Sequence, residues 1–274
     1  MGVNEPPAAG RDHVPPPMKI ALLVPGFSRH ERDWCIPALL DFVRVASANV
    51  NLHVYPIRWP ETRDTYRVFG ATVHGLGGGK RLGWRVLRLW RRVVHAIVAE
   101  HQRAAFDLLH AFWVDEPAWL AVWLARRLDV PVIVSVAGGE LVSLPEIDYG
   151  LQRHRGRGRL IGWALRHADR VTVGSRYLLT RAKEQLPEPE WRKLAVAPLG
   201  VETSRFHPDG LRMRSPERPI VLTVGSLSPV KGQWLLLEAI RVVPAAELWI
   251  AGDGSERGTL EALSARLGLA SRVR

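Results

Sequence analysis

Apolar and polar positions alternate with two different periods along most of this chain. Residues 19–26 (KIALLVPG) and 50–59 (VNLHVYPIRW) are short, apolar and rich in β-branched side chains, which is typical of buried strands. The segments between such runs carry an apolar residue at every third or fourth position, as amphipathic helices do. The same pattern predicts strands at residues 106–112, 130–140, 169–175 and 193–200, and helices at residues 35–46, 80–103, 118–128, 159–168 and 177–186. This alternation predicts an α/β fold, in which a parallel sheet is covered on both faces and binds ligands at the carboxyl ends of its strands.

A second block of the same kind begins near residue 219. Each of its units is a strand, a turn that contains glycine, and a helix. Unpaired N–H groups and the helix dipole both favour an anion at such a helix N-terminus, so each unit is a potential phosphate site. The predicted elements are the strand 219–225, the turn SLSPVKG, the helix 233–243, the strand 247–251, the turn Gly252-Asp253-Gly254, the helix 258–269 and the start of a third strand at 271–274.

Proline, glycine and charge mark the expected domain boundaries. Residues 1–17 form a proline-rich tail, and residues 18–197 form the first α/β domain. Residues 198–218 are the expected linker, and residues 219–274 are part of a second domain. A doubly wound domain commonly has about six strands. We therefore expect the second block to be incomplete, sensitive to protease beyond Pro219, and unable to cover the apolar faces at 235–237 and 248–250.

Composition narrows the class of protein. Hydrophobic residues make up 47% of the chain and charged residues 24%, which is typical of a folded globular protein. The single cysteine, Cys35, excludes an intramolecular disulfide, and no Cys/His cluster has the spacing of zinc ligands. The N-terminus lacks the apolar core of a signal peptide, and no apolar run is long enough to span a bilayer. We expect a cytoplasmic protein that is soluble or peripheral at the inner face of the membrane.

More than half of the net charge of +11 lies in residues 80–103, which hold seven Lys or Arg residues and one acidic residue. Arg81, Arg85, Arg88 and Arg92 recur at helical spacing and share one face. Three interpretations stay open: an ordinary surface helix, a face that meets anionic lipid, and a nucleic-acid contact. The last is disfavoured because no zinc-finger, RRM or basic-zipper pattern accompanies the charge. The opposite, apolar face is expected to hold Leu82, Val86, Leu89, Trp90, Val93 and Ile97.

Three stretches together resemble glycosyltransferase family 4, a family of retaining enzymes with the GT-B fold. They are the linker GVETSRFHP (200–208), the turn VGSLSPVKG (224–232) and the run ELWIAGDGSERGTLEALSARLGLASRVR (247–274). The resemblance covers nearly all of residues 18–274. It implies a complete N-terminal Rossmann-like domain on the acceptor side and the first two βα units of a second, nucleotide-sugar-binding Rossmann-like domain.

On the donor side, the resemblance implies that Lys231 neutralises the diphosphate leaving group. A lysine at a helix N-terminus is otherwise poorly placed relative to the dipole, which favours the functional interpretation over a solvated lysine. Gly225 is expected to let the pyrophosphate approach, and Gly252 and Gly254 to flank the base or ribose unless they form a plain turn. The remaining expected donor-binding residues are Ser226, Asp253, Ser175 and Arg176.

On the acceptor side, the resemblance places three strand-end segments at the cleft. Gly26 and Phe27 follow the first strand, although a Pro-Gly pair is more often only a turn. His110 lies in FDLLHAF, where a satisfied core histidine is equally expected. Gly138, Gly139 and Glu140 end VPVIVSVAGGE, where the glycines permit a sugar to approach and Glu140 is either an acceptor ligand or a surface carboxylate.

Three departures from the family pattern affect these expectations. Ala137 stands where many members have a histidine next to the transferred sugar. Ser226 stands where many have an arginine that pairs with the diphosphate, which removes a bidentate contact. The family's paired glutamates, which bind the donor sugar and ribose, do not occur in these 274 residues.

The sequence therefore predicts a retaining transferase that moves a sugar from a nucleotide-sugar donor to a saccharide or lipid-linked acceptor. No metal and no cofactor is implied, since Lys231 and helix N-termini would supply the positive charge. The 274-residue chain alone is expected to have little activity. The alternative is a catalytically incomplete fragment that acts as a binding module or docks on a membrane surface through residues 80–103.

Overall fold

The computed structural model describes residues 17–33, 35–80, 83–207 and 219–274. The chain divides into two compact units, which we call the first unit (Met1–Ser143 with Gly150–Val201) and the second unit (Leu144–Tyr149 with Glu202–Arg274). Residues 1–16 of the expected tail and residues 208–218 of the expected linker lie outside the described residues. The expected domain boundaries stay predictions.

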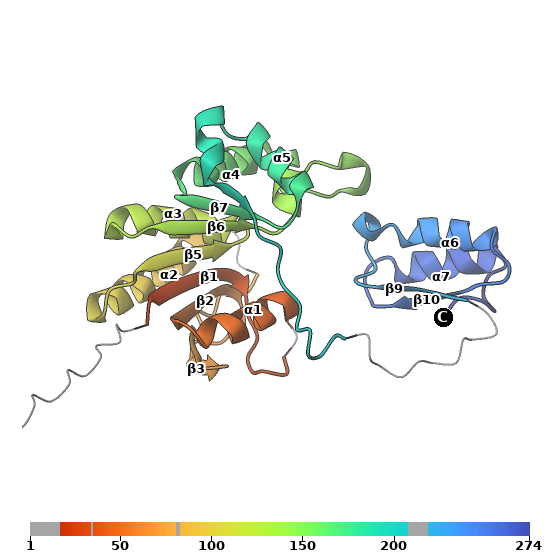
Figure 1. The fold of residues 1–274 in the computed structure, drawn as a ribbon, viewed down its shortest axis with the longest axis horizontal. Helices are drawn as coiled ribbons and strands as arrows, with labels where there is room; N and C mark the ends of the chain where they lie inside the picture. Colours follow the sequence, from red (N-terminus) through yellow and green to blue (C-terminus); the bar gives the residue numbers. More distant parts are fainter. Residues whose placement is uncertain (1–16, 34, 81–82, 208–218) are drawn as a thin grey trace, which may run out of the picture. The chain divides into compact units, whose positions relative to one another are not determined.

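An eight-stranded sheet forms the centre of the first unit, in the order β3-β4-β2-β1-β5-β6-β7-β8 (Figure 1). Neighbouring strands are parallel except for the pair β3–β4. The sequence prediction of a parallel α/β sheet is therefore confirmed. The strands are β1 (Lys19–Gly26), β2 (Asn51–Trp59), β3 (Thr65–Val68), β4 (Ala71–His74), β5 (Leu108–Phe112), β6 (Val132–Val136), β7 (Arg170–Val173) and β8 (Leu194–Val196).

Helices cover both faces of this sheet, so successive residues of a central strand are all buried. In β1, Leu22 and Val24 pack with α1 in one cluster, whereas Ala21 and Leu23 belong to the cluster on the other face. That second cluster contains residues of α2, α3, α4 and α5. Burial on both faces explains why the strand sequences are continuously apolar. The helices are α1 (Pro37–Ser47), α2 (Trp84–Arg103), α3 (Glu116–Leu128), α4 (Arg155–His167) and α5 (Arg176–Glu184).

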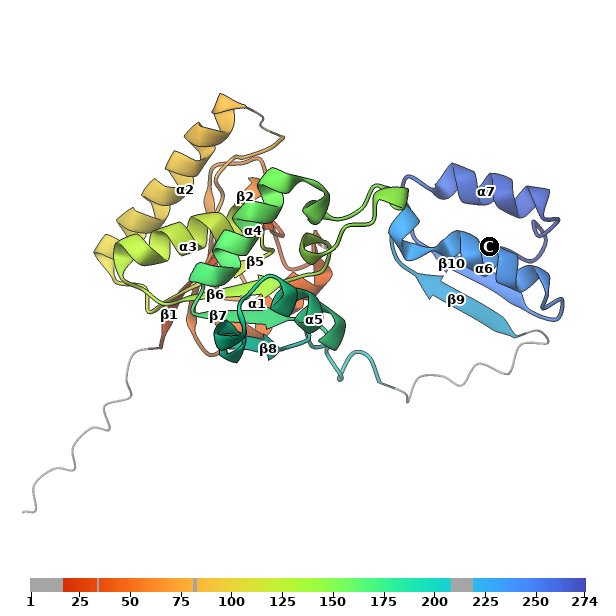
Figure 2. The ribbon, with the colours of Figure 1, turned by 90° about the horizontal axis from the view of Figure 1, so that it is seen from above.

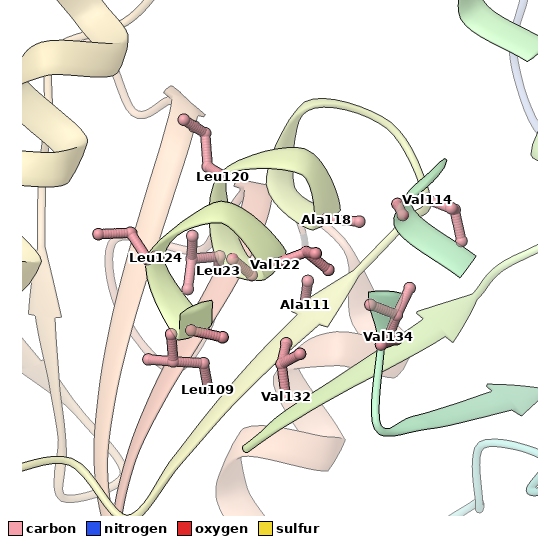
Figure 3. Packing of buried hydrophobic residues seen from close by; sticks show 14 of the residues in the cluster. Leu23, Leu109, Ala111, Val114, Ala118, Leu120, Val122, Leu124, Val132 and Val134 are labelled. Carbon is pink, nitrogen blue, oxygen red and sulfur yellow. The ribbon is translucent and has the colours of Figure 1, made fainter. Parts of the chain in front are cut away.

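Helix α3 lies at the middle of the larger core (Figure 3). It begins after Asp115 with Pro117 in its first turn, where the missing N–H of proline costs no helical hydrogen bond. Its small residues Ala118 and Ala121 are fully buried and let the helix approach β1 and β5 closely. Helices α2 and α4 contact it on either side, so the three helices form one layer (Figure 2).

The hairpin of β3 and β4 is absent from the sequence prediction. Its two-residue turn is Phe69-Gly70, and both residues have positive φ, 50° and 90°. Hairpin turns of this kind usually carry Asn-Gly or Asp-Gly. Here a phenylalanine occupies the first turn position, so the sequence carries no typical turn signal. The Phe69 ring packs against the core on the α1 side.

The second unit is a smaller version of the same arrangement. Strands β9 (Ile220–Val224) and β10 (Glu247–Ala251) are parallel, and α6 (Gln233–Arg241) and α7 (Arg257–Arg266) pack against each other. Val273 forms a parallel bridge with Leu248, which agrees with the expected start of a third strand.

The expectation of uncovered apolar faces in this unit is partly wrong. Leu237 and Leu248 are fully buried in the core that α6, α7 and β10 share. Apolar side chains that are exposed include two of β9, Leu222 at 59% and Val224 at 75%. Leu235 of α6 is also exposed.

Candidate functional site

The parallel strands of the first unit end at one edge, where the expected acceptor residues lie. Gly26 is the last residue of β1 and pairs with Trp59 at the end of β2. A Cβ at position 26 would approach the Trp59 Cβ to 3.1 Å, so the glycine serves close strand packing. The Phe27 ring is only 1% exposed and belongs to the core on the α1 side. Its contribution to a site is therefore limited to packing.

His110 lies inside β5, two residues before its end, and takes part in a chain of side-chain hydrogen bonds across the sheet. Its Nε2 is 2.8 Å from the Ser135 Oγ, which is 2.6 Å from the Thr172 Oγ1. Burial lowers the pKa of His110 to about 4, so the imidazole is neutral near pH 7. The side chain is therefore hydrogen-bonded within the sheet, and the assignment of His110 to the acceptor side stays a prediction.

The Glu140 carboxylate is neither a surface group nor open to a ligand, because the residue is 2% exposed. Its Oε1 accepts hydrogen bonds from the backbone N–H groups of Val114 (3.2 Å) and Ala137 (3.0 Å). Its Oε2 accepts one from the Gly138 N–H at 2.6 Å. Glu140, in the 3-10 helix Gly139–Leu141, thus ties the loop after β5 to the loop after β6 and positions both.

Asp115 lies in the same loop after β5, and the sequence prediction did not include it. Its Oδ1 is buried and has no hydrogen-bond partner among the residues that the structure describes. Burial, with smaller contributions from Glu140 and Glu116, raises the pKa of Asp115 to about 6, and Arg157 opposes the shift. A carboxyl group with this pKa can exchange a proton near neutral pH. The signal that was available is an Asp before Glu-Pro at the predicted start of a helix.

Ser175 and Arg176 lie at the end of β7 and the start of α5. The Ser175 Oγ accepts a hydrogen bond from the Leu178 N–H at 3.2 Å, so this side chain caps the helix. Arg176 is the first residue of α5 and is exposed. Their assignment to the donor phosphates stays a prediction.

In the second unit, the two strand-end loops pack directly on each other. The Gly225 N–H donates to the Ala251 carbonyl (3.0 Å), and the Leu227 N–H donates to the Asp253 carbonyl (2.9 Å). A Cβ at Gly252 would lie 1.9 Å from the Gly225 carbonyl oxygen, and one at Gly254 would lie 2.3 Å from that of Leu227. These two glycines are therefore required by the contact between the loops, independently of any ligand.

The polar side chains of these loops remain exposed. They are Ser226, Asp253 and Lys231, and Lys231 ends the short 3-10 helix Pro229–Lys231 just before α6. Within the part of the chain that the structure describes, the Lys231 ammonium forms no hydrogen bond or ion pair. A free cation beside a helix N-terminus can attract a diphosphate that also accepts backbone N–H bonds.

The basic helix differs from the expectation in one respect. Leu89, Val93 and Ile97 are buried as predicted, and Arg81 and Leu82 lie outside the described residues. The Arg92 guanidinium is partly buried and donates to the Leu76 carbonyl at 2.5 Å, so it does not belong to a solvated basic face. The exposed side of α2 mixes arginines with two apolar side chains, Trp84 and Leu87.

Residues 41–205 match the family described as Glycosyltransferase Family 4, and residues 213–274 match the one described as Glycosyl transferases group 1. No helix in the described ranges is long and apolar enough to cross a membrane. Among those residues, no group of three or more His, Cys, Asp or Glu side chains could hold a metal ion.

Two curated proteins illustrate the similarity. A GDP-mannose-dependent alpha-(1-6)-phosphatidylinositol monomannoside mannosyltransferase of Mycolicibacterium smegmatis is 33% identical over 193 residues, which are 65% of this chain and 46% of that protein. A D-inositol 3-phosphate glycosyltransferase of Segniliparus rotundus is 29% identical over 194 residues, which are 63% of this chain and 41% of that protein. The chain thus spans less than half the length of these relatives.

Solved structures agree on the fold. The sucrose-phosphate synthase of Thermosynechococcus elongatus has a TM-score of 0.70 at 20% identity and covers 94% of this chain, which corresponds to 69% of that protein. The catalytic domain of starch synthase IV from Arabidopsis thaliana has a TM-score of 0.60 at 13% identity, covering 95% of this chain and 74% of that one.

Proposed function

Because this chain belongs to glycosyltransferase family 4, we propose that it serves the transfer of a sugar from a nucleotide-sugar donor to a saccharide or lipid-linked acceptor, with retention of the anomeric configuration. The observation that carries the proposal is the pair of strand-end loops in the second unit. They present Ser226 and Lys231 to solvent beside the N-terminus of α6.

In this proposal the second unit binds the donor diphosphate. Lys231 contributes its charge, and N–H groups at the start of α6 contribute hydrogen bonds. As the glycosidic bond to the nucleotide breaks, negative charge develops on the leaving diphosphate, and a preorganised cation lowers the energy of that transition state. The leaving diphosphate then serves as the base that deprotonates the acceptor hydroxyl on the same face of the sugar.

The first unit would hold the acceptor at its strand-end edge. Glu140 positions the loops after β5 and β6 there, and Gly138 leaves open space beside its Cα. We assign Asp115 to contact an acceptor hydroxyl, because its buried Oδ1 has no hydrogen-bond partner among the described residues.

A lipid-linked acceptor is favoured by two observations. The name of the Mycolicibacterium smegmatis relative specifies a phosphatidylinositol monomannoside. In addition, residues 80–103 carry seven basic residues against one acidic residue, which favours contact with an anionic membrane from the cytoplasmic side. This contact would hold equally for the alternative function, a membrane-surface module without turnover.

Donor binding by the 274-residue chain tests the proposal. We expect UDP-, GDP- or ADP-sugars to bind in isothermal titration calorimetry. Lys231→Ala should weaken the affinity for the preferred nucleotide sugar by about tenfold, because a charge-assisted contact is lost. Arg241→Ala is the matched control, since it removes an equal charge from the exposed C-terminal turn of α6, the helix that follows Lys231. Equal affinity of both variants would exclude Lys231 as a diphosphate ligand.

A turnover assay on the same samples separates the two functions. Release of free nucleotide in the presence of an acceptor would favour the transferase, and would contradict the expectation that the 274-residue chain has little activity. Donor binding without turnover agrees with that expectation. No binding of any nucleotide sugar, together with binding to anionic vesicles, would favour the membrane-surface module.

A further inference from the structure

A long apolar groove runs along the outer surface of the helical layer of the first unit. Its volume is about 1070 Å³, and it lies between α2, α3 and α4. Five of the eleven tryptophans of the chain line it, with none of the residues discussed so far as donor or acceptor ligands among them. These tryptophans are Trp84, Trp90, Trp119, Trp123 and Trp163.

The three helices build the groove from residues that share a face. On α3, Trp119 and Trp123 are one turn apart, and Trp119 packs edge-to-face against Trp90 of α2 at 6.5 Å between ring centroids. The rim is apolar as well as exposed: Trp84 is 60%, Leu87 58% and Leu160 42% exposed. A contiguous apolar surface rimmed by polar residues is a candidate site of interaction.

The helices that form the groove carry a positive net charge, and Arg88 and Arg91 line the groove itself. The sequences of the three helices hold eleven arginines and two glutamates. Glu116 accepts hydrogen bonds from Arg58 at 2.6 and 2.8 Å, and Glu100 forms ion pairs with Lys19 at 2.7 Å and with Arg103 of the same helix at 3.3 Å. Two glutamates cannot neutralise eleven arginines, so the three helices keep a positive net charge.

Two arginines lie against tryptophan rings that line the groove. The Arg88 guanidinium lies 4.3 Å from the centroid of the Trp84 ring, and that of Arg127 lies 5.0 Å from the Trp123 ring. Each exposed tryptophan thus combines an apolar ring with a cation held over it. Indole rings with neighbouring arginines are the side chains that proteins place at the boundary between lipid headgroups and acyl chains.

We infer that the groove between α2, α3 and α4 seats an acyl chain of an anionic membrane lipid, with the lipid headgroup held by Arg88 and its neighbours on the rim. This inference rests on the membrane contact proposed for residues 80–103 and assigns that contact a binding site. Charge favours this occupant over a second copy of the chain, because two such grooves face to face would bring Arg88 and Arg91 of one copy against those of the other.

The test adds positive charge to the groove while removing apolar surface. Leu87→Arg and Leu160→Arg replace exposed groove residues, so the fold is retained, and both increase the attraction to an anionic surface. Val45→Arg is the matched control, because Val45 is 59% exposed on α1, which packs on the other face of the sheet. The measurements are sedimentation with vesicles of phosphatidylglycerol and phosphatidylcholine, and quenching of tryptophan fluorescence by vesicles with dibrominated acyl chains.

We expect the unchanged chain and Val45→Arg to bind these vesicles and to be quenched by the brominated chains. Leu87→Arg and Leu160→Arg should each weaken binding by about tenfold despite the added charge, since each removes a leucine that the lipid would bury. Binding as tight as that of Val45→Arg, or binding without quenching, would overturn the inference in favour of a purely electrostatic contact. Dimers in analytical ultracentrifugation that Leu87→Arg dissociates would assign the groove to a second copy instead.

A second probe separates this site from the membrane contact on which it rests. Monomeric lysophosphatidylglycerol, titrated below its critical micelle concentration, needs only the groove. If the unchanged chain binds this probe saturably and Leu160→Arg does not, the inference is supported. This holds even if no vesicles bind, and that result would contradict only the membrane contact. No binding of this probe to the unchanged chain counts against the groove, whatever the vesicles do.

Discussion

The strand-end loops of the two units use their polar groups in opposite ways. In the first unit, Glu140 accepts hydrogen bonds from three backbone N–H groups, and Ser175 caps a helix. His110 is hydrogen-bonded to Ser135 within the sheet. In the second unit, backbone groups alone join the loops, and the side chains of Ser226 and Lys231 stay in solvent. The same position at the end of a parallel strand can therefore build a scaffold or present a ligand site.

The difference follows from the number of strands in each unit and from the way in which their loops contact one another. The first unit joins eight strands and brings segments far apart in sequence together, so buried polar groups are needed to satisfy the loops between them. The second unit brings two short loops into contact through glycine, whose missing side chain permits the approach. Three substitutions test this comparison.

The largest effect is expected for Gly252→Ala. The new Cβ would collide with the Gly225 carbonyl oxygen, and φ is +158°, so the second unit should lose about 4 kcal/mol of stability. Gly258→Ala in α7 is the control, because a Cβ there meets nothing within 4 Å and alanine favours the helix. Hydrogen exchange of the β9 and β10 amides measures the loss. Equal protection in both variants would show that the loops tolerate separation.

A smaller loss, about 3 kcal/mol, is expected for Glu140→Ala, because three buried N–H groups lose a charged acceptor. Glu188→Ala removes a carboxylate that is exposed and serves as the control. Guanidinium unfolding, followed by the far-UV circular dichroism of the intact chain, gives the two free energies. A change below about 1 kcal/mol for Glu140→Ala would mean that water replaces the carboxylate, and the loops would not depend on it.

The smallest effect, about 2 kcal/mol, is expected from the pH dependence of Asp115. Its pKa is raised to about 6 in the folded state, so its stabilising contribution is full below the unfolded pKa near 4 and is lost as the pH rises through 6. Asp115→Asn does not titrate, and its stability relative to the unchanged chain should therefore increase between pH 4.5 and 7.5. Titrating groups that do not interact with Asp115 cancel in this difference. A difference that stays constant with pH would place the carboxyl in water.

Local patterns predicted most elements of the fold but not their contacts. The bounds of β1 and β10 agree with the predicted runs, because each is a largely apolar segment that ends at turn residues. The hairpin of β3 and β4 was missed, since Phe69 adopts a positive φ that only its packing explains. In the candidate site, Lys231 and its glycine neighbours were proposed from the resemblance of contiguous motifs to the family, and their roles stay predictions. Asp115 was not proposed, because nothing near it in sequence reports its burial.

The sequence by itself determined where the chain forms strands, helices and glycine turns, because these depend on side-chain periodicity and backbone freedom within a few residues. It determined the family for the same reason, from motifs that are contiguous. Only the tertiary structure decided that Glu140 joins two loops, that Gly252 is required by Gly225, and that tryptophans from α2, α3 and α4 line one groove. Each of these depends on distances between segments tens of residues apart, and such distances exist only after the helices have packed on the sheet.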